Sequence, residues 1–548
     1  MEKYPHYLER LQNATKKYWD KVALNTIGGE SFSFGQMATQ IEKFHLVFDA
    51  LGFKKGEKIA LYAANGARWG MVYMAVNTYE TVIVPLLADF TPENASFLVN
   101  HSDSVALFTN AAKWKNMDIA RMPNIRLVIN VDDWGCLWAA DEQTRATYDT
   151  MESLFAQKWP NGYGPDDVVF PTDNWDELST ISYTSGSTGD PKGVMLTYRN
   201  FSANVDYSQR HVPAGERMVS MLPMAHMYGL VIEFIYPLCN GTSIYWLGKA
   251  PTPAALMSAF AEVKPYLLIT VPLVMEKIYK SKVKPTLDKP VVKFLTKIPG
   301  VNRIIYNKVK DGLVSAFGGE VLEFIMGGAA LNPEVEKLFK KIHFPYLVGY
   351  GMTEACPLLA YEHWTKYVPG SCGKAVDVAQ VRIESEDPEH IAGEIQARGE
   401  NITIGYYKNP EASANAFTED GWLRTGDLGI IDKDGNIFIK GHSKSMILSA
   451  NGQTVYPEEL EAIINNQPYV AESVVVDRAG KIVALVYLDK DAIKRDGLDD
   501  EAVADIPEKV RVGANRKLPN YSQIAKVEVV LVPFEKTPKM SIKRFLYK

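Results

Sequence analysis

The residues best suited to chemistry stand between Tyr183 and Gly193, in the segment YTSGSTGDPKG. Five hydroxyl side chains, three glycines and Lys192 share these eleven positions. Hydroxyls and bare glycine amides can approach phosphate oxygens closely, and a lysine supplies a compact positive charge. A Ser/Gly-rich surface linker is the alternative, but a linker seldom ends in D-P-K-G-V and continues into a regular helix. The segment therefore predicts a phosphate-binding loop, although it lacks the Walker A pattern.

Three motifs downstream carry further groups that suit a nucleotide: MGGAAL (326–331), VGYGMTEACP (348–357) and WLRTGDLG (422–429). Glu354 offers a carboxylate to a hard cation, which needs few protein oxygens when phosphates supply the rest. A strand-to-turn junction and a surface β-turn are the plain alternatives for the second and third motifs. Their order behind the phosphate loop favours a nucleotide site.

Together these motifs resemble those of the adenylate-forming superfamily of acyl-CoA synthetases, luciferases and peptide-synthetase adenylation domains, from about residue 20 to the C-terminus. The resemblance implies ATP, Mg²⁺ and coenzyme A as cofactors. It implies that Tyr350 stacks on adenine, Thr353 touches the α-phosphate and Asp427 binds both ribose hydroxyls, while Thr184 and Glu354 hold Mg²⁺. The implied ATP and AMP contacts are Thr184, Ser185, Gly186, Ser187, Thr188, Gly189, Lys192, Gly328, Ala329, Gly349, Tyr350, Thr353, Asp427 and His442.

The C-terminal part matches the family with two departures. GEIQARGENITIGYYKNPEAS (393–413) resembles a bridging motif, and HSKSMILSANGQTVYPEELE (442–461) resembles a hinge with Lys444 at its pivot and Gly452 leaving room for the pantetheine arm. His442 stands where the family has a ribose-binding arginine. Ser541 stands where the family has a catalytic lysine, with Lys539 and Lys543 two positions away on either side. Because residues two apart share a face of an extended chain, either lysine is a candidate substitute.

The acyl substrate is indicated by LPMAHMYG (222–229) and the apolar stretch GLVIEFIYPLCNG (229–241). In the family a mobile aromatic residue or histidine gates the acyl pocket here, so His226 is the candidate gate, and a histidine without a special task is the alternative. The pattern resembles bacterial long-chain fatty acyl-CoA synthetases. An apolar channel gains about 0.8 kcal/mol per methylene, so we expect graded selection of chain length.

The resemblance implies ATP-dependent activation of a fatty acid to acyl-AMP, release of pyrophosphate, and transfer to coenzyme A. The catalytic candidates are Lys192, His226, Thr353, Glu354, Lys539 and Lys543. An acyl-AMP ligase that loads a carrier protein is one alternative, since both acceptors bring a pantetheine thiol. A nucleotide- and acyl-binding member with weakened catalysis is the other, because of His442 and Ser541.

The elements that must position these residues follow an α/β pattern. Residues 58–64 and 81–87 read as buried strands around a helix at 67–79, a βαβ unit. After about residue 370 the pattern changes to antiparallel strands, with a hairpin turn at DKDGN. We expect an α/β fold: a large N-terminal domain (1–440) of doubly wound α/β subdomains plus a small distorted β-barrel, and a smaller mobile α+β domain (441–548). A helix over 457–466 is expected in the latter.

The chain has 548 residues and a net charge of −6, from 59 Lys and Arg against 65 Asp and Glu. That balance gives no global attraction to nucleic acid. Four cysteines without a C-x-x-C pair argue against a disulfide framework and favour a cytoplasmic location. We find no signal peptide or membrane-spanning segment. The expected partners are small molecules, and peripheral membrane contact and a homodimer stay open.

Overall fold

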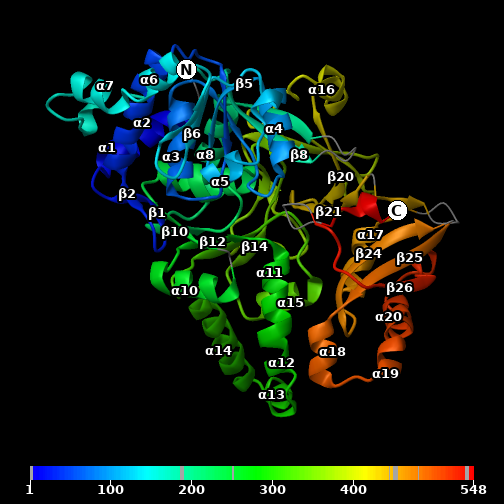
Figure 1. The fold of residues 1–548 in the computed structure, drawn as a ribbon. Coiled ribbons are helices and arrows are strands. Elements are labelled where there is room, and N and C mark those ends of the chain that lie inside the picture. The colour runs from blue at the N-terminus through cyan, green and yellow to red at the C-terminus, as the bar shows by residue number, and fades with distance from the viewer. Residues whose placement is uncertain are drawn as a thin grey trace.

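The computed structural model describes residues 4–185, 191–249, 252–443, 445–448, 454–478, 480–536 and 542–547, without the side chains of Ser185, Leu448, Thr454 and Tyr521. Figure 1 shows a large body and, beside it, a smaller unit coloured orange to red.

The first layer of the body is a seven-stranded sheet with the order β7-β6-β5-β3-β4-β8-β9. Strand β3 pairs in parallel with both β4 and β5. Every residue of α3 (Ala67–Thr78) except Arg68 is buried, which confirms the expected βαβ unit. The bounds are β3 (Lys58–Tyr62), β4 (Val82–Pro85), β5 (Ser104–Thr109), β6 (Leu127–Asn130), β7 (Cys136–Ala139), β8 (Leu178–Ser185), β9 (Pro191–Thr197), α4 (Pro92–His101), α6 (Glu142–Tyr148) and α7 (Met151–Lys158).

The second layer consists of two mostly parallel groups of strands, β10-β11-β1-β2 and β12-β13-β14. A hydrophobic core that includes Leu24, Ile59, Ile244 and Leu347 runs through both layers. The bounds are β1 (Val22–Thr26), β2 (Ser31–Ser33), β10 (Arg217–Ser220), β11 (Ser243–Trp246), β12 (Leu267–Thr270), β13 (Glu323–Met326), β14 (Tyr346–Val348), α1 (Tyr7–Lys17), α2 (Phe34–Ala50), α8 (Tyr198–His211), α10 (Pro253–Val263) and α15 (Pro333–Lys341).

Two antiparallel sheets, β15-β16-β17 and β18-β19-β20-β21, follow in the chain. Lys374 of β17 pairs with Asn436, and the amide of Cys372 donates to the carbonyl of Ile437 at 2.7 Å, so the two sheets join in one curved layer. This layer is the expected small distorted barrel. The bounds are β15 (Tyr350–Gly351), β16 (Leu358–Tyr361), β17 (Lys374–Ala375), β18 (Ala379–Glu384), β19 (Gly393–Gly399), β20 (Leu423–Ile431) and β21 (Ile437–His442).

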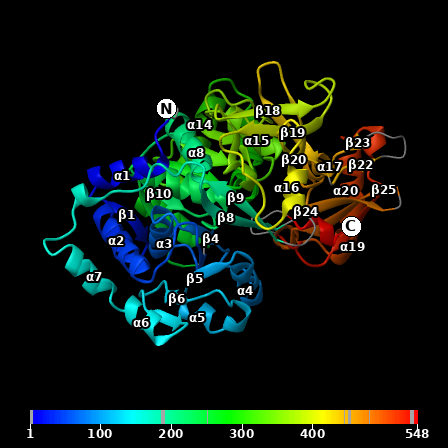
Figure 2. The ribbon, with the colours of Figure 1, turned by 90° about the horizontal axis from the view of Figure 1, so that it is seen from above.

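The smaller unit has its own apolar core, built on the sheet β24-β25-β26. Helix α17 spans Pro457–Ile464, as the sequence predicted. Figures 1 and 2 both place the barrel strands between the first sheet and this unit. The bounds are β22 (Ile447–Leu448), β23 (Thr454–Val455), β24 (Val470–Arg478), β25 (Lys481–Leu488), β26 (Lys526–Val530), α18 (Lys490–Asp496), α19 (Asp500–Ala504) and α20 (Ile506–Asn515).

A helix follows the phosphate loop, as expected, but a strand comes first. Residues Pro191–Thr197 form strand β9, and helix α8 begins only at Tyr198. A strand forms here because both of its edges are hydrogen-bonded. Strand β8 pairs with one edge, and on the other edge the amide of Met195 donates to the carbonyl of Gly405 at 2.9 Å. Thr197 then caps α8 through a capping box with Asn200.

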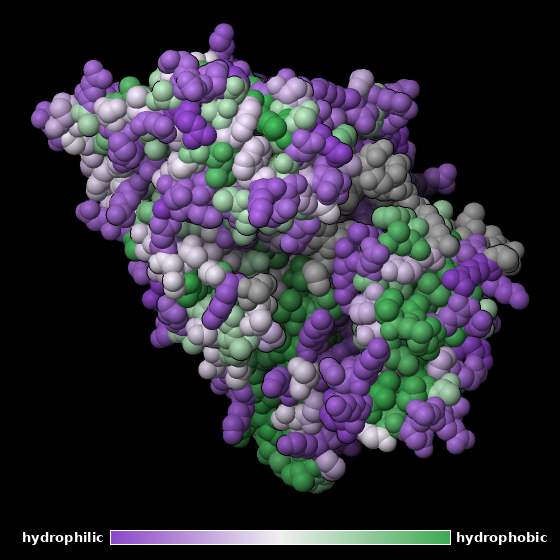
Figure 3. Space-filling model, in the orientation of Figure 1, coloured by the Kyte–Doolittle hydropathy of each residue, from purple (hydrophilic) through white to green (hydrophobic). Residues whose placement is uncertain are grey.

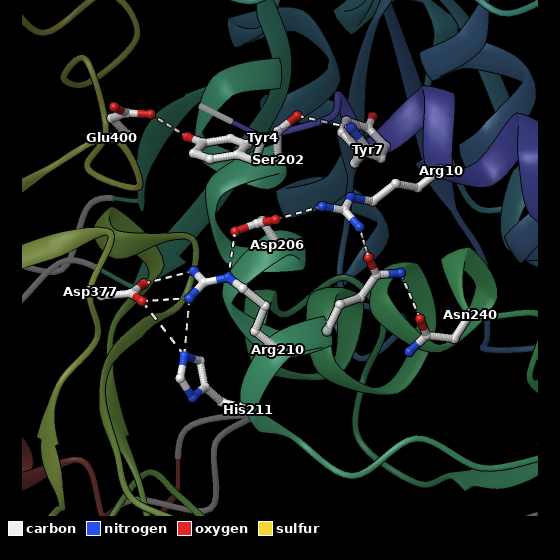
Figure 4. A network of polar contacts seen from close by, with 11 residues as sticks. Tyr4, Tyr7, Arg10, Ser202, Asp206, Arg210, His211, Asn240, Asp377 and Glu400 are labelled. Atoms are coloured by element: carbon white, nitrogen blue, oxygen red, sulfur yellow. Dashed lines mark hydrogen bonds and ion pairs between the residues drawn. The ribbon is translucent and has the colours of Figure 1, made fainter. Parts of the chain in front are cut away.

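A charged network ties the N-terminal helix to the barrel (Figure 4). Arg210 of α8 bonds Asp206 at 2.9 Å and, from its other side, Asp377 just before β18 at 2.8 Å. Arg10 of α1 shares Asp206. Helix α1 and the segment before β18, far apart in the sequence, thus hold α8 in a fixed place.

A helical segment projects from the lower end of the body in Figure 1. It consists of α11 (Pro272–Ile278), the π-helical η4 (Tyr279–Val283), α12 (Lys284–Leu287), α13 (Pro290–Leu295) and α14 (Val301–Ala316). Across the described ranges, no helix has the length and apolar character needed to span a membrane.

Candidate active site

The two arms of the phosphate loop are adjacent strands of the first sheet. Thr184 on β8 lies opposite Lys192 on β9, and Ser185 lies opposite Pro191. The hydroxyl of Thr184 donates to the backbone carbonyl of Lys192 at 3.5 Å. The predicted contacts Gly186, Ser187, Thr188 and Gly189, between these arms, lie outside the described residues. Antiparallel pairing thus brings Thr184 and Lys192 to one place, as a phosphate site requires.

A tyrosine that the sequence analysis did not single out connects the loop to the proposed cation ligand. The ammonium of Lys192 lies 5.1 Å from the centre of the Tyr406 ring, and the hydroxyl of Tyr406 donates to Oε1 of Glu354 at 2.9 Å. Burial raises the pKa of Tyr406, so the phenol keeps its proton and donates. The signal was present in the GEIQARGENITIGYYKNPEAS motif, but no local pattern shows which of its side chains faces the loop.

Glu354 and Thr184 offer a carboxylate and a hydroxyl, the hard oxygen ligands that Mg²⁺ prefers. Glu354 is half-buried, and its backbone carbonyl accepts from the amide of Thr403 at 2.8 Å. With Oε1 engaged by Tyr406, the second carboxylate oxygen is the one suited to a cation. The donor set fits magnesium, and its ligation by Thr184 and Glu354 stays a prediction.

The predicted adenine and ribose residues meet in the barrel. The hydroxyl of Tyr350 on β15 donates to Oδ2 of Asp427 on β20 at 2.6 Å. His442, at the end of β21, contacts the other oxygen of Asp427, and this hydrogen bond raises the pKa of the imidazole. Each carboxylate oxygen has two acceptor positions, so Asp427 can still accept from ribose hydroxyls. The residue that replaces the family arginine therefore lies at the predicted ribose site.

The glycine-rich turn lies at the end of β13, beside the predicted acyl residues. A side chain at Gly327 would press on the ring of Tyr228, whose nearest atom is 3.0 Å from the ideal Cβ. Gly328 has φ +85° with open space around it, and Ala329 is exposed. A backbone that turns here without side chains leaves a cradle in which an adenine ring can lie. Gly349 joins this turn through its amide, which donates to the carbonyl of Met326 at 2.8 Å.

The backbone of the loop that carries His226 is hydrogen-bonded to two polar side chains, Glu233 and Asn65. Oε2 of Glu233 accepts from the amides of Met221 and Leu222 at 3.0 and 2.9 Å. Asn65 bridges the carbonyl of Leu222 and the amide of Met224. His226 itself is half-buried, and its Nδ1 accepts from the amide of Tyr228 at 3.4 Å. The loop is anchored, and the gating role of His226 stays a prediction.

Glu233 lies in the apolar stretch predicted to wall the acyl pocket. Residues Gly229–Ile235 form a π-helix (η3) that is buried throughout, followed by α9 (Tyr236–Cys239). Burial raises the pKa of Glu233 to about 8, so the carboxyl group is largely protonated at neutral pH. π-Helical turns are rare and often mark functional sites. Neither the helix type nor the burial of Glu233 was foreseen, because local sequence does not show that the backbone of residues 221–222 folds onto this carboxyl group.

Several other predicted site residues stay untested by the described part of the chain. Thr353 is only 2% exposed, and its contact with an α-phosphate stays a prediction. Lys444, Gly452 and Lys539 lie outside the described residues, as does Ser541. Lys543 pairs with Glu535 of its own tail at 3.3 Å. Next to it, Arg544, which the sequence analysis did not single out, contacts the buried Glu461 of α17 and anchors the tail.

Residues 11–407 match the model of a family described as AMP-binding enzyme, and residues 444–547 match the AMP-binding enzyme C-terminal domain. The chain belongs to the AMP-binding enzyme family. The resemblance to adenylate-forming enzymes drawn from the motifs is thereby confirmed.

Relatives within this family include long-chain acyl-CoA synthetases and ligases. The chain is 28% identical over 476 residues to long chain acyl-CoA synthetase 6, peroxisomal, of Arabidopsis thaliana, a match that covers 81% of this chain and 66% of that one. It is 26% identical over 562 residues to long-chain-fatty-acid–CoA ligase FadD15 of Mycobacterium bovis, covering 93% and 89%.

Solved structures share the fold over nearly the whole chain. ATP-bound MatB from Rhodopseudomonas palustris is similar with a TM-score of 0.76 at 22% identity, covering 98% of this chain and 97% of that one. The anthranilate CoA ligase AuaEII in complex with anthranoyl-AMP is similar with a TM-score of 0.79 at 17% identity, covering 100% and 97%. The α/β fold with a large N-terminal and a small C-terminal domain is confirmed.

Proposed function

We propose that this AMP-binding enzyme activates a long-chain fatty acid with ATP to acyl-AMP and then transfers the acyl group to coenzyme A. The proposal rests on two groups of contacts. Lys192, Tyr406 and Glu354 form the first group, and Tyr350, Asp427 and His442 form the second. These two groups suit a triphosphate and a ribose. The names of the relatives from Arabidopsis and Mycobacterium support a long-chain fatty acid as the substrate.

In the first step a carboxylate oxygen of the fatty acid forms a bond to the α-phosphorus while the bond to pyrophosphate breaks. Lys192 and the hydroxyls around it would stabilise the charge that develops on the phosphate oxygens. Magnesium, when bound, neutralises phosphate charge, and Thr184 and Glu354 would hold it. Tyr406 keeps Glu354 oriented, and Asp427 with Tyr350 fixes the nucleoside.

In the second step the thiol sulfur of coenzyme A attacks the acyl carbonyl, the proton of the thiol is lost, and AMP leaves. We propose the division 1–440 and 441–548 with a hinge near Lys444, so that rotation of the small domain exchanges the tail for Gly452 at the site. Strand β21 runs to His442 before the chain leaves the barrel. A hinge directly after it would let His442 follow either domain.

On the acyl side, His226 would gate a pocket walled by η3. Asn65 and Glu233 hold the backbone just before His226, at residues 221–224. A protonated Glu233 adds no charge to an apolar wall, and so an acyl chain can pass it without facing an ion.

The test is pyrophosphate release from ATP, Mg²⁺ and palmitate, with and without coenzyme A. Slow release without coenzyme A and rapid, continuous release with it supports the ligase. Continuous release only with an acyl carrier protein favours the carrier-loading alternative. Nucleotide and palmitate binding without any release would identify a catalytically weakened member.

A cytoplasmic location and a homodimer stay predictions. Cell fractionation and light scattering of the purified chain test them separately from the activity.

A further inference from the structure

The projecting helical segment has a charge unlike that of the rest of the chain. Between residues 277 and 310 the sequence contains ten Lys and Arg residues and one acidic residue, Asp288, whereas the whole chain has a net charge of −6. The ten are Lys277, Lys280, Lys282, Lys284, Lys289, Lys293, Lys297, Arg303, Lys308 and Lys310. A local positive field of this size attracts an anionic surface even when the protein as a whole is acidic.

The segment packs weakly against the body. Helices α12 and α13 contain no buried residue, and the sixteen residues of α14 contain one, Leu313. Figure 1 shows α13 at the extreme lower end of the molecule, away from both sheets. These helices therefore owe little of their position to the core, and their outer surface is available to a partner.

Large apolar side chains lie on this outer surface among the lysines. Val291 and Phe294 of α13 are 70% and 65% exposed, and Ile304 of α14 is 69% exposed. Figure 3 shows hydrophobic residues in green at this lower end, next to hydrophilic ones in purple. Apolar groups at the tip of a positively charged projection are typical of surfaces that enter the interface of a membrane.

The positive charges are mostly not neutralised by the protein. Lys280 donates to the backbone carbonyls of Asn465 and Val470 in the smaller unit at 2.9 and 3.4 Å. Among the residues that the structure describes, Lys284 is the one member of the ten with an ion pair, to Asp288 at 3.5 Å. Lys289, Lys293 and Lys297 are all exposed. Unpaired lysines with apolar stems can reach phosphate groups while the stems lie along lipid or protein.

We propose that residues 277–310, with Val291, Phe294 and Ile304 at the tip, form a docking surface for anionic lipid bilayers. The charge complements anionic headgroups, and the exposed apolar side chains enter the boundary between headgroups and acyl chains. A nucleic acid would match the charge but would leave Val291, Phe294 and Ile304 without apolar partners. Docking is independent of catalysis, and it would place the enzyme where long-chain fatty acids collect.

The first experiment measures sedimentation of the full-length protein with vesicles. Binding to phosphatidylcholine vesicles containing one third phosphatidylserine should exceed binding to pure phosphatidylcholine vesicles at least tenfold, and should fall when salt is raised from 0.05 to 0.5 M. Equal binding to both vesicles, or none to either, overturns the proposal, whatever the activity of the enzyme.

The second experiment distinguishes the effect of the lysines in the projecting segment from the effect of the net charge of the protein. Lys289→Glu/Lys293→Glu/Lys297→Glu should weaken binding about a hundredfold or more, since each basic residue near an anionic surface contributes about fivefold. The matched control, Lys115→Glu/Lys366→Glu/Lys433→Glu, alters the net charge equally at exposed sites elsewhere. A control that loses as much binding as the tip variant overturns the proposal.

The third experiment tests the apolar contribution. Val291→Ser/Phe294→Ser should weaken vesicle binding about tenfold, whereas Val169→Ser/Ile391→Ser, at positions 76% and 55% exposed, should not. Melting temperature and palmitate-dependent pyrophosphate release in detergent confirm that each variant is folded. If the tip variant binds vesicles as the parent does, or if the charge variant loses stability without losing vesicle binding, the surface serves another contact, such as the acidic helix α19, and the proposal fails.

Discussion

The predicted nucleotide site of the large domain and the C-terminal tail of the small domain differ in how their polar side chains are paired. In the predicted nucleotide site, groups from distant parts of the chain face one another: Tyr350 bonds Asp427 at 2.6 Å, and Tyr406 bonds Glu354 at 2.9 Å. In the tail, Lys543 is held by Glu535, and Arg544 is held by Glu461.

The difference indicates which parts of the site are ready before substrate binds. Strands β9, β15 and β20 are fixed by their neighbours in sheets, so the fold itself positions Lys192, Tyr350 and Asp427, as preorganised catalysis would require of the predicted site. Lys543 and Arg544 of the tail pair with carboxylates of the small domain itself. The contribution of the tail to catalysis therefore depends on how that domain is oriented.

The largest effect on the reaction rate should come from a substitution in the predicted nucleotide site. Lys192→Ala should slow acyl-AMP formation by about 10²–10³-fold, because a positive group aimed at the phosphates is lost. Single-turnover formation of acyl-AMP measures this. Lys408→Ala is the matched control, since Lys408 pairs with Asp103 on the surface at 2.8 Å. A loss of less than tenfold for Lys192→Ala would remove the phosphate loop from the mechanism.

In the tail, two adjacent residues should differ in their effect on stability. Arg544→Ala should destabilise the small domain by about 3 kcal/mol, because it leaves the buried Glu461 without its positive partner. Lys543→Ala should cost less than about 0.5 kcal/mol, since its pair with Glu535 is exposed. Calorimetric melting of both variants is the measurement. Equal destabilisation would contradict the assignment of Arg544 as the anchor.

The missing family lysine allows a gain of function. Ser541→Lys should raise the rate of acyl-AMP formation about tenfold and leave thioester formation from preformed acyl-AMP unchanged, because a positive charge offsets developing phosphate charge where a hydroxyl cannot. Ser541 lies outside the described residues. If Lys539 or Lys543 already acts there, the gain is smaller, and Lys539→Ala or Lys543→Ala slows adenylation selectively. No effect of all three variants would exclude the tail from catalysis.

The smallest predicted effect is a pH dependence of the KM for ATP that is caused by His442. Its contact with Asp427 raises the pKa of the imidazole above the ordinary value of 6.5. The stabilisation by the charged pair is therefore complete below pH 6.5 and is lost as the pH rises through the raised value. We expect the KM for ATP to rise about threefold over that interval in the parent and to stay flat in His442→Gln.

The matched control is His211→Gln, which removes another exposed histidine beside an aspartate, Asp377, at 3.6 Å. A pH profile that changes equally in both variants would contradict a role of His442 at the ribose site.

The sequence by itself determined the family, the α/β class and the order of the motifs. Local patterns suffice for these: the βαβ unit over residues 58–87, the DKDGN hairpin and helix α17 all follow from the periodicity and turn chemistry of short segments. The phosphate loop could be named from its glycines, hydroxyls and lysine, whereas Asp427 and Glu354 could be named because the motifs around them resemble those of the adenylate-forming superfamily.

The tertiary structure decided which residues distant in the sequence are in contact. Tyr406 lies between Lys192 and Glu354 because β9 pairs with the segment around Gly405, more than two hundred positions away in the chain. The same pairing makes residues 191–197 a strand, and the expected helix begins after it, at Tyr198. Glu233 became a buried, largely neutral acid only when the backbone of residues 221–222 was folded onto it. The positive charge of residues 277–310 can be counted in the sequence, but only the fold leaves Val291 and Phe294 exposed beside it, because too little of the core reaches them to bury them.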